Sequence, residues 1–203
     1  MVDFLSNVLI FLRTNIFLAF GIYSIGFFLL KIIASYKIRI ILTSFDQAAI
    51  KLVIYSGILY FVIWILGSSW WYIESDVATR QSYFDRISGP YWFGVLLSPF
   101  SYLFLTQLLR IHIFNKYLIF RIIISLCLVP TFELYVIIVT SFHQDYMSFN
   151  LLRQFNFTPA QIIISLTIKL LIFIGLTGLL FYILKQTQSY KKNEPDLDSE
   201  IID

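Results

Sequence analysis

Long apolar runs dominate this chain and alternate with short polar segments. A helix needs about 20 mainly apolar residues to cross the hydrocarbon core of a bilayer. Runs of that length cover roughly residues 16–35, 49–68, 90–110, 117–142 and 161–185. Each run is apolar on every side, which is typical of a helix in lipid and not of an amphipathic surface helix. The pattern predicts an all-α integral membrane protein with a bundle of about five transmembrane helices.

Capping chemistry predicts where some of these helices begin. Thr158, Pro159 and Gln161 offer an N-cap hydroxyl, a proline at the first helical position and a capping-box amide. The segment from Ser44 to Gln47 offers the same kind of start before the second run. We therefore interpret Asp46 and the glutamine after it as residues that cap a helix rather than as ligands.

The two ends of the chain are more polar than the five runs. Residues 1–15 mix polar and apolar side chains, which fits either an interfacial segment or an extension of the first span. Residues 187–203 turn polar and then acidic, which is typical of a solvated, disordered tail. The expected organisation is an N-terminal interfacial segment at 1–15, a five-helix bundle at 16–186 and an acidic cytoplasmic tail at 187–203.

Basic residues are distributed unevenly between the two sides of the predicted bundle. Ten of the 15 Lys and Arg residues flank the runs on one side. These ten are Lys31, Lys37, Arg39, Lys51, Arg110, Lys116, Arg121, Lys185, Lys191 and Lys192. The positive-inside rule places this side in the cytoplasm, so the N-terminus is expected outside and the C-terminus in the cytoplasm.

Composition excludes several classes of protein. Apolar residues make up 59% of the chain and charged residues 13%, whereas soluble proteins have about 45–50% and about 25%. The single Cys127 excludes an intramolecular disulfide, and two histidines exclude a pair of b haems. The basic residues are scattered among hydrophobic runs, so no nucleic-acid surface is expected. No phosphate-binding glycine loop, metal-ligand cluster or nucleophile with its base is recognisable, so we expect no catalytic centre or metal site in the chain itself.

Two ionisable residues lie well inside the apolar runs. Glu133 in the fourth run and Lys169 in the fifth are both expected about 12–15 Å below the outer surface, at 1.5 Å per residue. Isolated charges at that depth cost about 2.5–3.5 kcal/mol each, so an interhelical pair is expected. The pair could be a static link, a proton relay near quinone, or a contact with another subunit. His143 and Asp145 end the fourth run and fit either a proton entry point or a helix-end hydrogen-bonded pair.

Aromatic residues gather near the predicted outer loop, which extends from Gly67 to Gly89. The main ones are Trp70, Trp71, Tyr91 and Trp92. Trp and Tyr prefer headgroup depth, so an interfacial belt is the first interpretation, and one wall of a quinone or lipid pocket is the second. Asp85 and Arg86 are candidates for ordering this loop.

Two stretches resemble a known family. They are residues 85–92 and 132–145, with the sequences DRISGPYW and FELYVIIVTSFHQD. Both are similar to polysulfide-reductase-type (NrfD-like) membrane subunits, especially the large quinol-complex membrane subunits of alternative complex III. In that family a Gly-Pro-Tyr segment opens one helix, and a later helix carries a Glu, an aliphatic run ending in Thr-Ser, and then a His and an Asp. The resemblance covers residues 45–185 and only the second helical bundle of the family.

Two positions depart from the family pattern. Leu134 and Gln144 stand where the family commonly has arginine. Lys169 is the candidate replacement for the lost partner of Glu133. The positions that match the family motif are Glu133, His143 and Asp145, which the resemblance implies are proton-path or structural polar residues and not nucleophiles.

The resemblance implies a membrane subunit of a quinol-linked respiratory electron-transfer complex in the bacterial inner (plasma) membrane. Such a subunit binds no cofactor itself, anchors redox subunits and packs beside other integral membrane subunits in the lipid bilayer. Quinone, either menaquinone or ubiquinone, is the ligand that it could hold. Two alternatives remain open: a non-catalytic structural or assembly subunit of another membrane machine, and a small transporter or channel.

The expected pair can be tested by a double-mutant cycle. If Glu133 and Lys169 interact directly, the double substitution Glu133→Gln/Lys169→Met should destabilise the protein less than the two single changes added together, because neither charge is left alone. Thermal unfolding of the four proteins in detergent measures the difference. Simple additivity would reject the pair.

Overall fold

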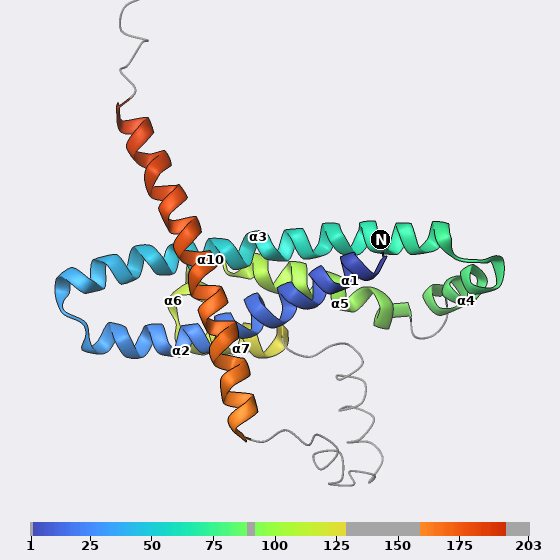
Figure 1. Ribbon diagram of the computed structural model, residues 1–203, viewed down its shortest axis with the longest axis horizontal. Helices are drawn as coiled ribbons and strands as arrows, with labels where there is room; N and C mark the ends of the chain where they lie inside the picture. Colours follow the sequence, from blue (N-terminus) through green and yellow to red (C-terminus); the bar gives the residue numbers. More distant parts are fainter. Residues whose placement is uncertain (1, 89–91, 129–158, 194–203) are drawn as a thin grey trace, which may run out of the picture.

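The computed structural model describes residues 2–88, 92–128 and 159–193, and within these ranges the chain is helical and contains no strand (Figure 1). Three helical segments are long and apolar enough to cross a membrane, namely Val2–Ile33, Tyr36–Glu74 and Ile163–Thr187. The all-α class is therefore confirmed for this part of the chain. Five spans and the orientation of the termini stay predictions.

The first spanning segment is one helix with a local irregularity. It consists of α1 (Val2–Leu12), a five-residue π-helical turn (Arg13–Phe17) and α2 (Leu18–Ile33). The Leu18 N–H donates to the carbonyl of Arg13, which is the i→i−5 bond of a π turn. The segment at 1–15 is thus continuous with the first span from Val2 onward.

The second spanning segment, α3 (Tyr36–Glu74), begins well before the expected start at residue 49. At 39 residues it is about 58 Å long, which exceeds the hydrocarbon core. The predicted cap at residues 44–47 is wrong, because the Thr43 and Ser44 hydroxyls donate one turn back, to the carbonyls of Arg39 and Ile40. This back-bonding lets hydroxyl residues lie inside a helix, and no glycine or proline between residues 36 and 48 ends it.

Much of the predicted outer loop is helical. After α3 ends at Glu74, α4 (Val77–Ser88) begins almost at once. Asp76 precedes α4, and its Oδ1 accepts a hydrogen bond of 3.2 Å from the backbone N–H of Thr79. Hydrogen bonds from Thr79 to the carboxylate lower the pKa of Asp76 below its ordinary value. The anionic form of this exposed cap is therefore the one that supports the start of α4.

The remaining described helices pack against α2, α3 or one another. They are α5 (Trp92–Leu108), α6 (His112–Lys116), α7 (Leu118–Leu128) and α10 (Pro159–Asn193). Figure 1 shows α5 lying along α3, α7 along α2, and α10 crossing the others obliquely. The helix start predicted at Pro159 is confirmed. The helix α10 continues to Asn193, while its apolar spanning segment ends at Thr187.

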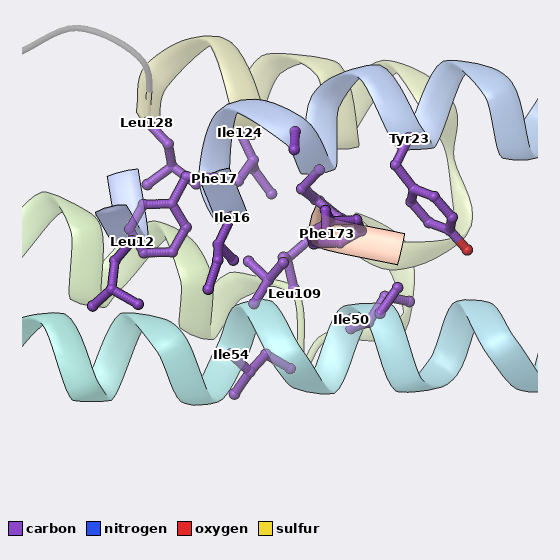
Figure 2. Close-up of a cluster of buried hydrophobic side chains, with 14 of the residues drawn as sticks. Leu12, Ile16, Phe17, Tyr23, Ile50, Ile54, Leu109, Ile124, Leu128 and Phe173 are labelled. Carbon is purple, nitrogen blue, oxygen red and sulfur yellow. The ribbon is translucent and has the colours of Figure 1, made fainter. Parts of the chain in front are cut away.

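The core is a layer of apolar side chains where these helices meet. Figure 2 shows Phe17, Tyr23 and Phe173 together with aliphatic residues of α3 and α7. The Phe17 ring is fully buried and stacks on Tyr102, with centroids 5.4 Å apart. Because lipid is as apolar as these side chains, close packing rather than the hydrophobic effect holds such helices together.

The closest approach between α3 and α5 occurs at Gly57. A Cβ atom at this position would overlap Oγ1 of Thr106 and lie 2.7 Å from its Cβ. Thr106 is fully buried, and its hydroxyl donates 2.8 Å to the carbonyl of Tyr102. The glycine is therefore required by the helix crossing and not by its backbone conformation.

We predict that Gly57→Ala lowers thermal stability, whereas Gly26→Ala does not. Both changes gain about 1 kcal/mol of helix propensity, and nothing lies within 4 Å of a Cβ atom at Gly26. The clash at Gly57 should cost about 3 kcal/mol, the upper end of the usual penalty of overpacking, so the net loss should be about 2 kcal/mol. Unfolding in detergent followed by circular dichroism measures both variants. Equal melting temperatures would show that the α3–α5 crossing is looser than described.

Candidate functional site

A buried ion pair joins α3 to α7. Arg121 Nη1 donates to Asp46 Oδ1 and Arg121 Nη2 donates to Asp46 Oδ2, each at 2.7 Å. The exposed fractions of the two side chains are 3% for Arg121 and 7% for Asp46. This parallel two-bond geometry is the strongest form of a carboxylate–guanidinium contact.

The helices place the two partners from distant parts of the sequence. Asp46 lies in the first half of α3 on the face that also carries Ala49, Ile50 and Val53, all of which are buried. Arg121 lies in the first turn of α7, just after the short helix α6. Its Nε donates 2.6 Å to the backbone carbonyl of Asn115, so the guanidinium also fixes the turn between α6 and α7.

Aromatic rings of α2 surround the guanidinium. The Cζ atom of Arg121 lies 6.0 Å from the ring centroid of Phe20, 5.5 Å from that of Phe27 and 5.3 Å from that of Phe28. Rings at this distance attract a cation through their negative faces, and the attraction grows when water is excluded. The cation is therefore stabilised by both α3 and α2.

Tyr23 lies beside the pair. Its ring is buried and its hydroxyl is close enough to Asp46 and Arg121 to interact with both charges. The hydroxyl nevertheless makes no hydrogen bond of ordinary geometry with a described residue. Tyr23 thus adds a polar atom to the edge of an otherwise closed pair.

The chemistry open to this site is limited. Each oxygen of Asp46 accepts one hydrogen bond from the guanidinium, and the carboxylate is buried, so solvent and ligands have little access to it. Within the described ranges, no group of three or more His, Cys, Asp or Glu residues could hold a metal ion. The arrangement is that of a structural link between α2, α3 and α7.

The local sequence predicts the wrong role for both partners. Asp46 was expected to cap a helix, but it lies inside α3 and is 5% exposed. Arg121 was counted with the surface cations, but it is 2% exposed and faces Asp46. The sequence does contain a sign of the pair. Asp46 is the only acidic residue between Asp3 and Glu74, and every other charged residue in that stretch is basic.

Several predicted site residues lie outside the described ranges. These are Glu133, His143, Asp145 and Tyr91. The expected partner of Glu133, Lys169, lies in α10 and is half-buried. The Glu133–Lys169 pair therefore stays a prediction.

The outer aromatic residues that the structure describes fall on two helices. Trp70 is exposed near the end of α3, and its Nε1 donates 2.6 Å to Oε1 of Glu74. Trp71 lines a mainly apolar groove of about 330 Å³ between α3 and the start of α1, together with Trp64 and Leu5. Trp92 is the first residue of α5. Of the predicted outer aromatic residues, Trp71 is thus one that lines a groove.

The two residues expected to order the outer loop both lie in α4. Asp85 accepts a hydrogen bond of 3.2 Å from Nε2 of Gln81, one turn earlier in the same helix. Arg86 follows it in the last turn.

Comparison with known proteins adds no relative. The chain matches no family model, no curated protein and no solved structure. What the fold and the site define is therefore a helical protein of membrane type whose described polar centre is a closed ion pair.

We predict that breaking the Asp46–Arg121 pair destabilises the protein more than removing it. Asp46→Asn leaves a buried guanidinium without its counter-charge and should cost about 3–5 kcal/mol. The double substitution Asp46→Leu/Arg121→Met should be milder than the sum of the single changes, because no charge remains. Lys37→Gln, an exposed change in α3, serves as the control and should be nearly neutral.

The wild type, Asp46→Leu, Arg121→Met and their double variant form the cycle, and thermal unfolding in detergent compares them with Asp46→Asn and Lys37→Gln. A double variant that loses as much stability as both single variants added together would mean that the two residues act independently, contrary to the geometry.

Proposed function

We propose that this chain is a membrane subunit of a quinol-linked respiratory electron-transfer complex, in which it anchors redox subunits. The observation that carries the proposal is the segment from Phe132 to Asp145, with its Glu, aliphatic Thr-Ser run, His and Asp in the order of the NrfD-like subunits. The segment from Asp85 to Trp92 supports it. The membrane character itself follows from three apolar helices of spanning length.

The exposure of α10 supports an anchoring role. In the most apolar 18-residue stretch of Ile163–Thr187, only 11% is buried against the rest of the chain. The corresponding shares for the two earlier spanning segments are 39% and 44%. Ile163, Ile168 and Leu171 are each more than half exposed. A helix with so little internal packing is suited to contact lipid on one side and a partner helix on another.

We further propose five spans with the N-terminus outside and the C-terminus in the cytoplasm of the bacterial inner membrane. Charge along the described helices favours this orientation. Three basic residues, Lys31, Lys37 and Arg39, lie at the end of the bundle where α2 meets α3, whereas the opposite end carries two, Arg80 and Arg86. The basic end is the one that the positive-inside rule places in the cytoplasm.

The groove beside Trp71 is the candidate place for a quinol ring in this proposal. Its volume of about 330 Å³ lies at the lower end of the range of small-molecule sites. Trp64 and Trp71 offer flat apolar faces there. Glu133, Lys169, His143 and Asp145 are the proposed proton-path residues.

A second candidate is a structural or assembly subunit without a redox partner. The closed Asp46–Arg121 pair favours it, because this described polar centre joins helices and offers no free acid or base. Leu134 and Gln144, where the family has arginine, point the same way.

Purification from native membranes in a mild detergent distinguishes the two. We expect the tagged chain to carry partner subunits with the visible absorption of haem or iron–sulfur centres, identified by mass spectrometry. An unrelated multispan protein from the same membranes, purified in parallel, controls for carry-over. A colourless assembly would favour the structural candidate, and recovery of the chain alone would overturn the respiratory proposal.

A further inference from the structure

A second groove lies at the basic end of the bundle, between α3 and the segment that joins α5 to α6. Its volume is about 420 Å³. The polar residues that line it are Gln47, Lys51, Tyr55, Arg110 and Asn115. The α3 residues among them, Gln47, Lys51 and Tyr55, are spaced four positions apart, so they form one stripe of the helix. Ile50, Ile54 and Leu109 form the apolar floor.

The two cations of this groove are not neutralised by the described part of the chain. Lys51 and Arg110 are both exposed, and neither makes an ion pair with a described carboxylate. Asp46 is the one described carboxylate at this end of the bundle, and both of its oxygens are held by Arg121. Two positive charges therefore share the groove, and the carboxylate of Asp46 is paired with Arg121 rather than with either of them.

The position of the groove relative to the membrane surfaces follows from the spacing of residues along α3. Trp70 follows Lys51 by 19 residues, which is about 28 Å of helix at 1.5 Å per residue. This distance matches the hydrocarbon thickness of about 30 Å. With Trp70 at one membrane surface, a depth that tryptophan favours, Lys51 lies near the headgroup level of the other surface. The hairpin formed by α2 and the start of α3 then extends beyond that surface.

The groove also continues toward the hydrocarbon core. Tyr55, Ile58 and Leu59 follow Lys51 along α3, and they are 57%, 37% and 48% exposed. An acyl chain attached to a headgroup in the groove would run along these side chains. A free ion would use only the two cations and the amides.

We propose that this groove binds the phosphate of an anionic phospholipid, with Lys51 and Arg110 contacting its oxygens. The planar guanidinium of Arg110 suits two-point contact with phosphate, and the Lys51 ammonium acts as a compact charge. The Gln47 amide is placed to donate a further hydrogen bond, and the apolar stripe beyond Tyr55 holds one acyl chain. Basic pockets between membrane helices on the cytoplasmic side commonly bind anionic headgroups.

Occupation of the groove would brace the ion pair. Asn115 lines the groove, while its backbone carbonyl accepts the hydrogen bond from Nε of Arg121. A lipid that holds α3 against the α5–α6 connection therefore also holds the turn that positions Arg121. This inference requires a bilayer but no redox partner, so it stands or fails independently of the respiratory role.

The test is a lipid titration of the full chain in detergent, followed by native mass spectrometry. The probes are phosphatidylglycerol, phosphatidylcholine with the same acyl chains, and inorganic phosphate. We expect phosphatidylglycerol to bind, and Lys51→Gln/Arg110→Gln to weaken its binding about 30-fold, since each basic residue near an anionic surface contributes about 1 kcal/mol. Lys37→Gln/Lys185→Gln removes two exposed charges outside the groove and should leave binding within about twofold, a change too small to reflect a lost contact of about 1 kcal/mol.

Each remaining outcome is decisive. Equal binding of phosphatidylcholine, or equal losses in the two double variants, would overturn the proposal. Displacement of the lipid by millimolar phosphate would mean an anion site without a lipid preference and would also overturn it. If the groove variant does not fold, Lys51→Arg keeps the charge and should bind like the wild type, whereas each single glutamine variant should bind about fivefold more weakly, as expected from the loss of about 1 kcal/mol. Single glutamine variants that bind as tightly as the wild type would overturn the proposal.

Discussion

The burial of one carboxylate together with one guanidinium constrains the arrangement of α2, α3 and α7. Neither charge is stable in an apolar environment alone, so the two helices that carry them must dock in one register. Nη1 of Arg121 donates to Oδ1 of Asp46 and Nη2 donates to Oδ2, each at 2.7 Å, and this parallel geometry restricts how α3 and α7 can slide past each other. The rings of Phe20, Phe27 and Phe28 then fix α2 over the cation. A polar contact thus selects among the many positions that apolar helix faces would accept.

The helix crossings away from the pair depend on small residues. Gly57 admits the side chain of Thr106 between α3 and α5, and Gly21 lies against Ser125 between α2 and α7. These contacts bring backbones close enough for dispersion forces to act, which is the main attraction available between helices in lipid. The charged pair gives the bundle its register, and the glycines let the helices pack closely in that register.

The sequence was sufficient for the class of the protein and insufficient for the site. Long apolar runs and the Thr158-Pro159 start predict helices whose existence depends on local chemistry, and α10 begins at Pro159 as expected. The predicted start of α3 is wrong because the hydroxyls of Thr43 and Ser44 can either cap a helix or donate to carbonyls one turn back within it. The local sequence does not distinguish these two roles. The Asp46–Arg121 pair was missed because its partners are 75 residues apart and the contact depends on the tertiary arrangement. Counting basic residues to find the cytoplasmic side assumes that every arginine lies at the surface, and this assumption fails for the buried Arg121.

The π turn at Arg13–Phe17 makes the two parts of the first spanning segment face different neighbouring helices. One extra residue in the turn rotates everything after it by about 100° relative to a regular helix. The part before the turn, α1, packs against α3, whereas the part after it, α2, packs mainly against α7. A single continuous helix therefore presents two apolar faces that are out of phase. Any search for one uninterrupted stripe along residues 2–33 would average the two faces and find neither.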